Sequence, residues 1–160
     1  MQPFVHLHVH SQYSVLDGQA SVKALVDKAI ANGMRGIALT DHGNMFGIKE
    51  LTDYVNKKNK DVDGEIKNLK KTIEELKSAD AVDQEALSKA ETALKEAESK
   101  IFTPIIGCEM YVADNDMTDR SNKKDIGRHL IVLAKNQHGY HNLIKLVSNA
   151  WTDGYYYHPR

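Results

Sequence analysis

The chain has 160 residues, of which 41% are hydrophobic and 27% are charged, a composition typical of one folded globular domain. Its formal net charge of -1 provides no broad basic surface for a polyanion, so any nucleic-acid binding must depend on local features. Cys108 is the only cysteine, which excludes an internal disulfide. Because the sequence has neither a basic start followed by an apolar core nor an apolar stretch of about 20 residues, we expect a cytoplasmic protein.

The first predicted strand, 4–10, carries histidines at alternate positions. Side chains of an extended segment alternate between two faces, so His6, His8 and His10 share one face and apolar residues the other. Neighbouring histidines of this row lie about 6.6 Å apart and the outer two about 13 Å apart. Metal–nitrogen bonds are only about 2.0–2.1 Å long, so adjacent histidines can share an ion and the outer two cannot. We select His8 and His10, nearer the carboxyl end, and place His6 deeper, as an inner ligand or a support for one.

The segments that follow alternate between helix and strand patterns. After a loop, Ser21 is the predicted N-cap of a helix that Gly33 ends. A short apolar strand then delivers Asp41 and His42 to its carboxyl end. The loop, this strand and the next helix are predicted at 11–19, at 36–40 and from residue 46 onward. This order is typical of an α/β fold with a parallel sheet.

Residues 57–100 differ in character from the rest of the chain. These 44 residues contain 10 lysines, 11 acidic residues and no aromatic residue. Apolar residues recur there at spacings of three and four, in two stretches separated by 78–83. We interpret the segment as a charged helical hairpin inserted into the α/β fold. It is either a solvated arm whose apolar seam closes on itself or an arm that binds a partner.

The strand pattern resumes after the charged segment, and we expect the parallel sheet to continue. Two strands are predicted over 103–112 and 129–134, followed by a helix over 140–151. The first of these strands carries Glu109 in an otherwise apolar run, and the second begins with His129. Because an unpaired buried carboxylate is costly, Glu109 requires a partner, and a metal ion would serve.

Six candidate metal ligands lie at or beside the ends of predicted strands or in the loop that follows: His8, His10, Asp17, His42, Glu109 and His129. Imidazole and carboxylate together suit Zn, Mn or Fe better than Mg or Ca. Two ions about 3.5–4 Å apart, bridged by a carboxylate such as Glu109, would polarise a phosphoryl group and activate a water molecule. We expect Asp41 to orient one of the imidazoles. The set predicts the hydrolysis of a phosphate ester.

Several of these motifs resemble the polymerase and histidinol phosphatase (PHP) domain, and the matching positions are 8–11, 16–18, 40–43, 107–109 and 129. Longer strings resemble the amino terminus of the bacterial DNA polymerase III alpha subunits, at 12–18, 38–47, 129–136 and 139–143. The resemblance covers everything outside the hairpin. It implies a distorted barrel of seven βα units, and it places the six candidate residues at metal-ligand positions of the family.

The chain also departs from the family pattern. PHP domains complete their site with further His and Asp residues on later strands, ending in an Asp-x-His pair that does not occur here. Without residues 57–100, 116 residues remain, well under the roughly 250 of a typical barrel. We therefore expect residues 1–160 to be the truncated amino-terminal part of a PHP domain. On its own, this fragment should hydrolyse weakly or not at all.

Three functions remain open. In the first, the chain begins a replicative DNA polymerase III alpha subunit, a nucleotidyltransferase whose partners are DNA and other replisome subunits. Its metal-binding PHP module then either trims 3′ ends as a 3′–5′ exonuclease or holds the polymerase together. The second is a free-standing phosphatase for a small phosphate ester such as histidinol phosphate, and the third a non-catalytic structural module. We also expect self-association, because an unclosed parallel sheet leaves an unpaired edge.

The remaining conspicuous residues receive structural interpretations. Cys108 is expected to be a small core residue on the other face of its strand. His138, His141 and His158 are interpreted as surface groups. The tyrosines at 155–157 are interpreted as a segment that lacks its neighbours, rather than as a platform on which bases stack.

Overall fold

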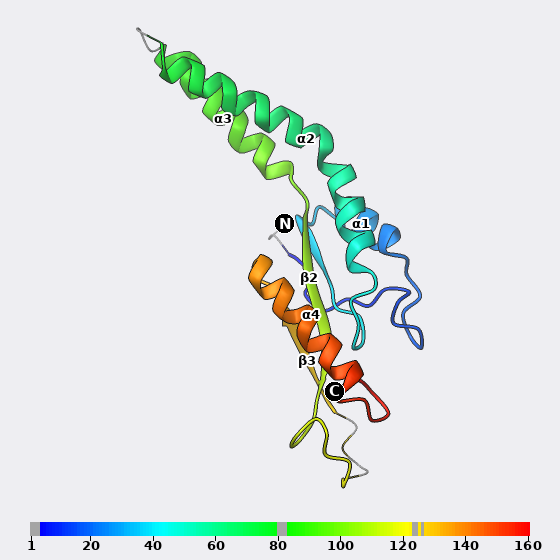
Figure 1. The fold of residues 1–160 in the computed structure, drawn as a ribbon. Helices are drawn as coiled ribbons and strands as arrows, with labels where there is room; N and C mark the ends of the chain where they lie inside the picture. Colours follow the sequence, from blue (N-terminus) through cyan, green and yellow to red (C-terminus); the bar gives the residue numbers. More distant parts are fainter. Residues whose placement is uncertain (1–3, 80–82, 123–124, 126) are drawn as a thin grey trace. The chain divides into compact units, whose positions relative to one another are not determined.

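The computed structural model describes residues 4–79, 83–122, 125 and 127–160 (Figure 1). The helices and strands of this part are, in chain order, α1 (Val22–Ala31), β1 (Gly36–Leu39), α2 (Ile48–Lys77), α3 (Gln84–Lys100), β2 (Thr103–Val112), β3 (Arg128–Leu133) and α4 (Gln137–Thr152). The chain divides into two compact units. The first unit consists of Met1–Asp53 and Thr103–Arg160, and the second of Tyr54–Phe102.

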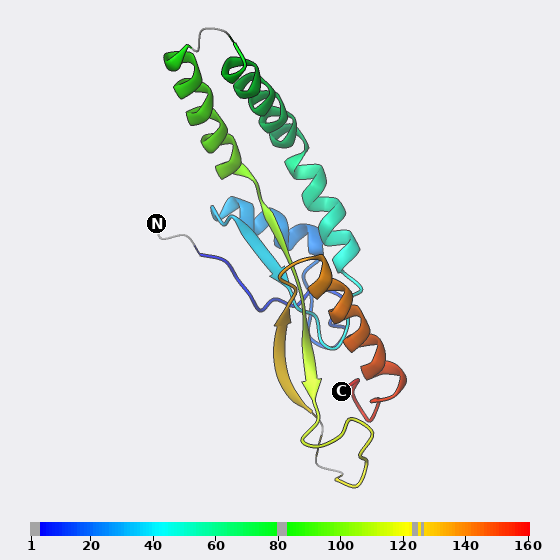
Figure 2. The same ribbon diagram turned by 60° about the vertical axis from the view of Figure 1, so that its left-hand side comes forward.

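The sheet of the first unit is mixed, with β2 between β1 and β3 (Figure 2). β1 pairs with β2 in parallel, from Gly36 opposite Thr103 to Leu39 opposite Ile106. β2 pairs with β3 in antiparallel, in a register that includes Glu109 opposite Ile131. Three of the four expected strands are confirmed, but a wholly parallel sheet is wrong. The described residues between β2 and β3 contain no crossover helix, so the chain turns back directly beside β2. The seven-unit barrel stays a prediction.

Residues 4–10 do not form the regular strand that their alternation predicts. They run beside β1, where the amides of Ala38 and Thr40 donate to the carbonyls of His6 and Val9, each at 2.9 Å. A bend at residues 7 and 8 separates these two hydrogen bonds and interrupts the ladder. Leu7 is 49% exposed, so the face opposite the histidines is not wholly buried.

The helices α1 and α4 of the first unit each begin at a capping side chain. The Ser21 hydroxyl accepts from the amide of Ala24 at 3.2 Å and starts α1, and Gly33 follows the helix at a φ of 72°. α4 begins earlier than expected because the side chain of Asn136 accepts from the amide of Gly139 at 3.0 Å. This capping hydrogen bond adds a first turn before the apolar residues that indicate the helix in the sequence.

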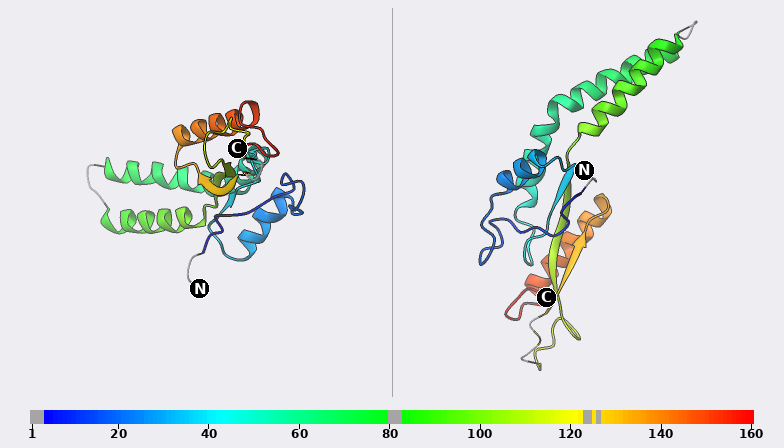
Figure 3. Two further views of the ribbon diagram at one scale, coloured as in Figure 1. Left: turned by 90° about the horizontal axis from the view of Figure 1, so that it is seen from below. Right: turned by 180° about the vertical axis from the view of Figure 1, so that it is seen from behind.

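The two faces of β2 have different surroundings in the first unit. Cys108 and Met110 pack with Leu143 and Ala150 of α4, which runs along the sheet (Figure 3). Glu109 lies between these residues in the strand and therefore points to the opposite face. The prediction that Cys108 is a core residue is confirmed, since its side chain is fully buried.

The second unit consists of most of α2 together with α3. Ion pairs connect the two helices, at 3.3 Å between Lys70 and Glu98 and at 3.0 Å between Lys77 and Glu91. α2 begins at Ile48, close to the helix start expected at residue 46, and continues without a break into the segment 57–100 that was expected to form a separate hairpin. The interruption expected at 78–83 includes residues 80–82, which lie outside the described part. That this segment is an insertion stays a prediction.

Within the described residues, no helix combines the length and the apolar character needed to cross a membrane.

Candidate metal centre

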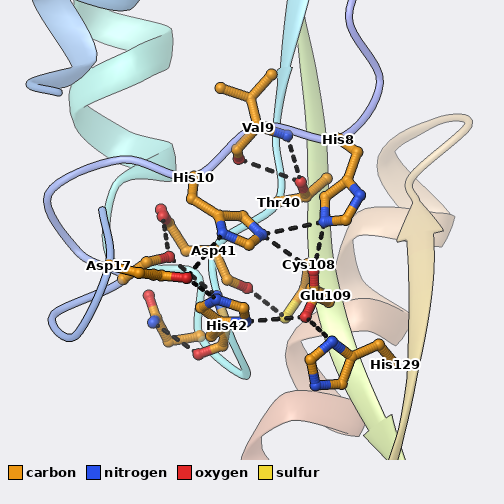
Figure 4. A network of polar contacts seen from close by, with 12 residues as sticks. His8, Val9, His10, Asp17, Thr40, Asp41, His42, Cys108, Glu109 and His129 are labelled. Carbon is orange, nitrogen blue, oxygen red and sulfur yellow. Dashed lines mark hydrogen bonds and ion pairs between the residues drawn. The ribbon is translucent and has the colours of Figure 1, made fainter. Parts of the chain in front are cut away.

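Glu109 is the centre of a cluster of imidazoles on the face of β2 opposite α4 (Figure 4). Its side chain is 1% exposed. One carboxylate oxygen, Oε2, contacts the Nε2 atoms of His8 and His10, the latter at 3.0 Å. The other, Oε1, lies 2.8 Å from Nδ1 of His42 and 2.6 Å from Nδ1 of His129. Each oxygen therefore faces two imidazoles.

His8 and His10 reach Glu109 from the segment beside β1. Their Nε2 atoms lie 3.1 Å apart, although residues 4–10 do not form a regular strand. The bend at residues 7 and 8 brings the two rings together, with ring centroids 4.9 Å apart. The pairing predicted for these two histidines is confirmed in the geometry, and their role as ligands stays a prediction.

His42 connects Glu109 to Asp17, which lies in the loop after His10. Nε2 of His42 is 3.0 Å from Oδ2 of Asp17, and Nδ1 of His10 is 3.8 Å from the same oxygen. His42 follows β1 and forms an isolated parallel bridge with Glu109. The carboxyl end of β1 thus places the His42 imidazole beside Glu109 in β2, in agreement with the position predicted for His42 at a strand end.

The electrostatics of the cluster favour ionised carboxylates. Burial alone would raise the pKa of Glu109, but hydrogen bonds from His8 and His10 and the charges of His42 and His129 hold it below its usual value. The hydrogen bond with His42 lowers the pKa of Asp17. Burial would lower the pKa of His42, but the Asp17 hydrogen bond and the nearby Glu109 charge outweigh it and raise that pKa. The cluster is therefore an array of anionic oxygens interleaved with imidazoles.

The donor atoms are spaced as metal ligands require. Two ligands of one tetrahedral ion, each bound at about 2.0–2.1 Å, lie about 3.3 Å apart. Within each of three groups, the donor atoms all lie within 4.8 Å of one another: His8, His10 and Glu109; His10, Asp17 and His42; and His42, Glu109 and His129. Each group shares a residue with the other two. Each group could hold a metal ion, and Glu109 belongs to two of the three groups.

Two of the predicted site residues have different surroundings from those expected. The Asp41 carboxylate, which is buried, accepts from the amide and hydroxyl of Ser11 at 2.7 and 2.8 Å and from the hydroxyl of Ser14 at 2.7 Å. Its hydrogen bonds within the described part go to the loop after His10, and its role in orienting an imidazole stays a prediction. His6 contacts the ring of Phe4 and belongs to none of the three groups.

Sequence reasoning missed the two serines that hold this loop. Ser11 and Ser14 are buried, and the Ser14 hydroxyl also accepts from the amide of His42 at 3.2 Å. Through Asp41 they fix the turn that carries Asp17 toward His42. Their three-residue spacing beside a predicted ligand is the signal that could have identified them.

The surroundings of His158 also differ from the sequence prediction. It is partly buried, and its ring stacks on Tyr111 with centroids 4.5 Å apart and planes at 15°, so it is not the surface group that was expected. The ring of Tyr111 in turn meets His129 edge-on at 4.9 Å. The isolated position of His158 in the sequence, 29 residues after the nearest predicted ligand His129, provides no signal for this contact.

The chain is also similar in sequence to known proteins. A family model described as PHP domain matches residues 6–160. DNA polymerase III subunit alpha of Treponema pallidum is 41% identical over 160 residues, covering 98% of this chain and 10% of the relative. The proteins of the same name from Borreliella burgdorferi and Helicobacter pylori are 38% and 34% identical, each over 98% of this chain and over 10% and 9% of the relative. The chain thus spans about a tenth of the length of these curated relatives, and the resemblance stated from the motifs is confirmed.

Proposed function

The chain belongs to the PHP-domain family, and from this premise we propose that it is the metal-binding PHP module of a replicative DNA polymerase III alpha subunit. The observation that carries the proposal is the environment of Glu109, a buried carboxylate whose two oxygens each face two imidazoles. Burying a carboxylate among four imidazoles is expensive unless cations or protons balance it. Bound cations would balance the charge of this carboxylate, and Glu109 would be one of their ligands.

The proposed ligands are the six residues selected from the sequence: His8, His10, Asp17, His42, Glu109 and His129. Their mixed nitrogen and oxygen donors suit Zn, Mn or Fe. Such ions, when bound, polarise a phosphoryl oxygen and lower the pKa of a water molecule toward neutrality. The proposed local chemistry is therefore the hydrolysis of a phosphate ester, such as the last phosphodiester at the 3′ end of a nucleic acid.

The exposure of each proposed ligand indicates its role in this chemistry. Glu109 is buried and fixes the positions of the surrounding imidazoles. His8, His129 and Asp17 have side chains more than half exposed, so the centre is open to a substrate on their side. Asp41 acts indirectly, by holding the loop that presents Asp17.

Template-directed DNA synthesis is proposed for the whole protein, with DNA and other replisome subunits as its partners. The support is the name shared by relatives that are 34–41% identical to this chain. In that setting, the module either trims 3′ ends or stabilises the polymerase. The contacts of Glu109 favour the structural role as a second candidate, because one carboxylate joins residues 8–10, the end of β1 and β3.

Metal binding is tested on the 160-residue chain, stripped with a chelator and reloaded with Zn, Mn or Fe(II). We expect stoichiometric metal by mass spectrometry, and its loss in the double variant His8→Ala/His10→Ala. The matched control is His138→Ala/His141→Ala, which removes two histidines of α4 that belong to none of the three donor groups. Equal metal content in the two double variants, or none in the parent chain, contradicts the proposal.

Hydrolysis is tested separately, by the release of nucleotides from the 3′ end of a single-stranded oligonucleotide. We expect little release by the 160-residue chain alone and chelator-sensitive release by the longer polymerase. Robust, chelator-sensitive release by the 160-residue chain would contradict the expectation that this part is inactive by itself. Stoichiometric metal without release by either protein would favour the structural role.

A further inference from the structure

A cavity of about 250 Å³ lies beside the metal centre and is lined by side chains that the proposed function does not use. It belongs entirely to the first unit, and His42 is shared between its wall and the metal centre. Aromatic rings form much of the remaining wall, namely Tyr13, Phe46, Tyr111, Trp151, Tyr155 and Tyr157. A concave site with this lining, next to a centre for phosphate chemistry, is a candidate for the non-phosphate part of a substrate.

The aromatic wall is fixed to the turn that carries His42. The indole Nε1 of Trp151 donates to the carbonyl of Gly43 at 2.7 Å, which sets the orientation of the ring. Gly43 adopts a φ of 59°, and a Cβ atom at this position would lie 2.6 Å from Cγ of Pro159. The turn after β1 and the segment after α4 therefore approach closely, so the rings and His42 are held at adjacent positions.

The rings on the outer side of the cavity keep much of their surface exposed. Trp151, Tyr155 and Tyr157 are 46%, 48% and 66% exposed. The Trp151 and Tyr155 rings stack on each other, with planes inclined by 23° and centroids 5.6 Å apart. Tyr157 is the one non-glycine residue with a positive φ in the described part of the chain, at 61°. Such strained backbones cluster at ligand sites, and here the strain places an aromatic ring at the cavity rim.

The charge of the lining restricts what the cavity can bind. None of the described lining residues is a lysine or an arginine, so the cavity has no fixed positive charge for a phosphate. A planar, uncharged ring suits it better, because every nucleobase has a face that stacks on aromatic side chains. The phosphate of the same molecule would then lie toward His42 and the metal centre.

We propose that this cavity binds the terminal base of a nucleotide, or of a single-stranded nucleic acid, whose phosphate lies at the metal centre. The inference rests on the proposed function and specifies its substrate as a phosphate ester with a stacking base. It replaces the interpretation of residues 155–157 as a segment without a binding role.

The cavity has little means of telling one base from another. The Asn44 amide donates to the carbonyls of Tyr13 and His42 and accepts from the amide of Phe46. The Ser14 hydroxyl donates to Asp41 and accepts from His42. With the side chains of Asn44 and Ser14 already engaged, we expect stacking to contribute most of the binding, and bases should be accepted with similar affinity.

Trp151 is the only tryptophan of the chain and reports directly on the cavity. Its fluorescence is followed while metal-loaded protein is titrated with thymidine 5′-monophosphate or with 2-deoxyribose 5-phosphate, which has the phosphate but no base. We expect saturable quenching and at least about tenfold tighter binding for the nucleotide. Deoxyadenosine 5′-monophosphate should bind within a few-fold of the thymidine compound. Equal affinities for the nucleotide and the base-free phosphate, or no binding of either in the millimolar range, overturn the inference.

Ring-deletion variants locate the binding. Tyr157→Gly removes a ring at a position where glycine is favoured by the positive φ, so this variant should fold at least as well as the parent chain. The double variant Tyr155→Ala/Tyr157→Gly should weaken nucleotide binding by about tenfold to a hundredfold. Phe4→Ala is the control, since it removes an exposed ring that does not line the cavity. Unchanged affinity in both tyrosine variants, with native circular dichroism, overturns the inference.

The metal content of each variant separates this inference from the proposed function. Full metal content without base-dependent binding overturns the cavity assignment alone. If no metal binds, thymidine itself replaces the nucleotide in the titration, because stacking requires no phosphate. Quenching by thymidine that is lost in Tyr157→Gly then supports the cavity while the proposed function fails, and no quenching overturns both.

Discussion

The two units of the molecule use the same acidic residue types in opposite ways. In the first unit, Glu109 is buried and contacts four imidazoles within one cluster. In the second unit, Glu91 and Glu98 stay about half exposed and form ion pairs with Lys77 and Lys70. The first arrangement surrounds one buried carboxylate with imidazoles, whereas the second spreads charge over a solvated surface.

This difference shows that the density of charge in a sequence does not locate chemistry. Residues 57–100 contain 21 charged residues, about half of the charge of the chain, and their described ion pairs are surface pairs worth less than about 1 kcal/mol each. One carboxylate in an apolar strand is more informative, because burial makes its partners obligatory. The comparison can be tested from both sides.

The largest effect is expected at Cys108, which precedes Glu109 in β2 and points to the opposite face. Burial raises the pKa of this thiol to about 12. Only the thiolate reacts with iodoacetamide, so near pH 8 labelling should be at least about 1,000-fold slower in the native chain than in denaturant. The rate is followed by mass spectrometry. Comparable rates in the two states would mean that this side of β2 is not packed as described.

The second prediction compares one glutamate from each unit. Glu109→Gln keeps the shape of the side chain but removes the charge that faces four imidazoles. We expect metal affinity to fall by at least about 100-fold, measured by competition with a chromophoric chelator. Glu98→Gln is the matched change in the second unit, and it should leave metal affinity unchanged. Equal losses in both variants would remove the distinction between the two regions.

The third prediction concerns the buried carboxylate that does not contact an imidazole. Asp41→Asn removes the charge from three hydrogen bonds to Ser11 and Ser14, and it should lower the free energy of unfolding by about 2 kcal/mol. Urea unfolding with chelator present measures the effect without metal binding. Asp53→Asn, at the exposed pair with Lys49, should change stability by less than about 0.5 kcal/mol.

A stability loss in Asp41→Asn no larger than that in Asp53→Asn would mean that the loop after His10 does not depend on Asp41. A normal stability together with a loss of metal would instead make Asp41 a direct participant in the metal centre.

The smallest effect is expected between α2 and α3. Lys77→Gln removes one surface ion pair with Glu91 and should lower the free energy of unfolding by less than about 1 kcal/mol. The loss should shrink further at high salt, since exposed pairs are screened. Urea unfolding at low and high salt measures both quantities. A loss of several kcal/mol would show that the second unit depends on its charges as strongly as the first.

Much of the fold could be predicted because its signals are local. Ser21 caps α1 and Gly33 follows it, as the residue types indicate, and the apolar runs of β1, β2 and β3 were recognisable from composition and length. The candidate ligands were identified in the same way, because a histidine or an acid at a strand end stands out in an apolar context. The approach of His42 to Glu109 followed from the parallel pairing of β1 and β2.

What could not be predicted depends on contacts between distant segments. The direction of β3 depends on how the loop after β2 returns, and apolar alternation is the same in a parallel and an antiparallel strand. The bend at residues 7 and 8 and the partners of Asp41 depend on the position of the loop after His10. His158 reaches Tyr111 only because the segment after α4 folds back.

The sequence by itself determined which residues are available for chemistry, since periodicity, caps and unpaired acids in apolar runs are properties of short segments. The tertiary structure alone decided which of them meet. Glu109 acquires four imidazole partners, Asp41 acquires two serines, and the aromatic residues near the end of the chain come to line a cavity beside His42. The physical reason is that burial makes every polar group find a partner, and the nearest partner in space is seldom the nearest in the chain.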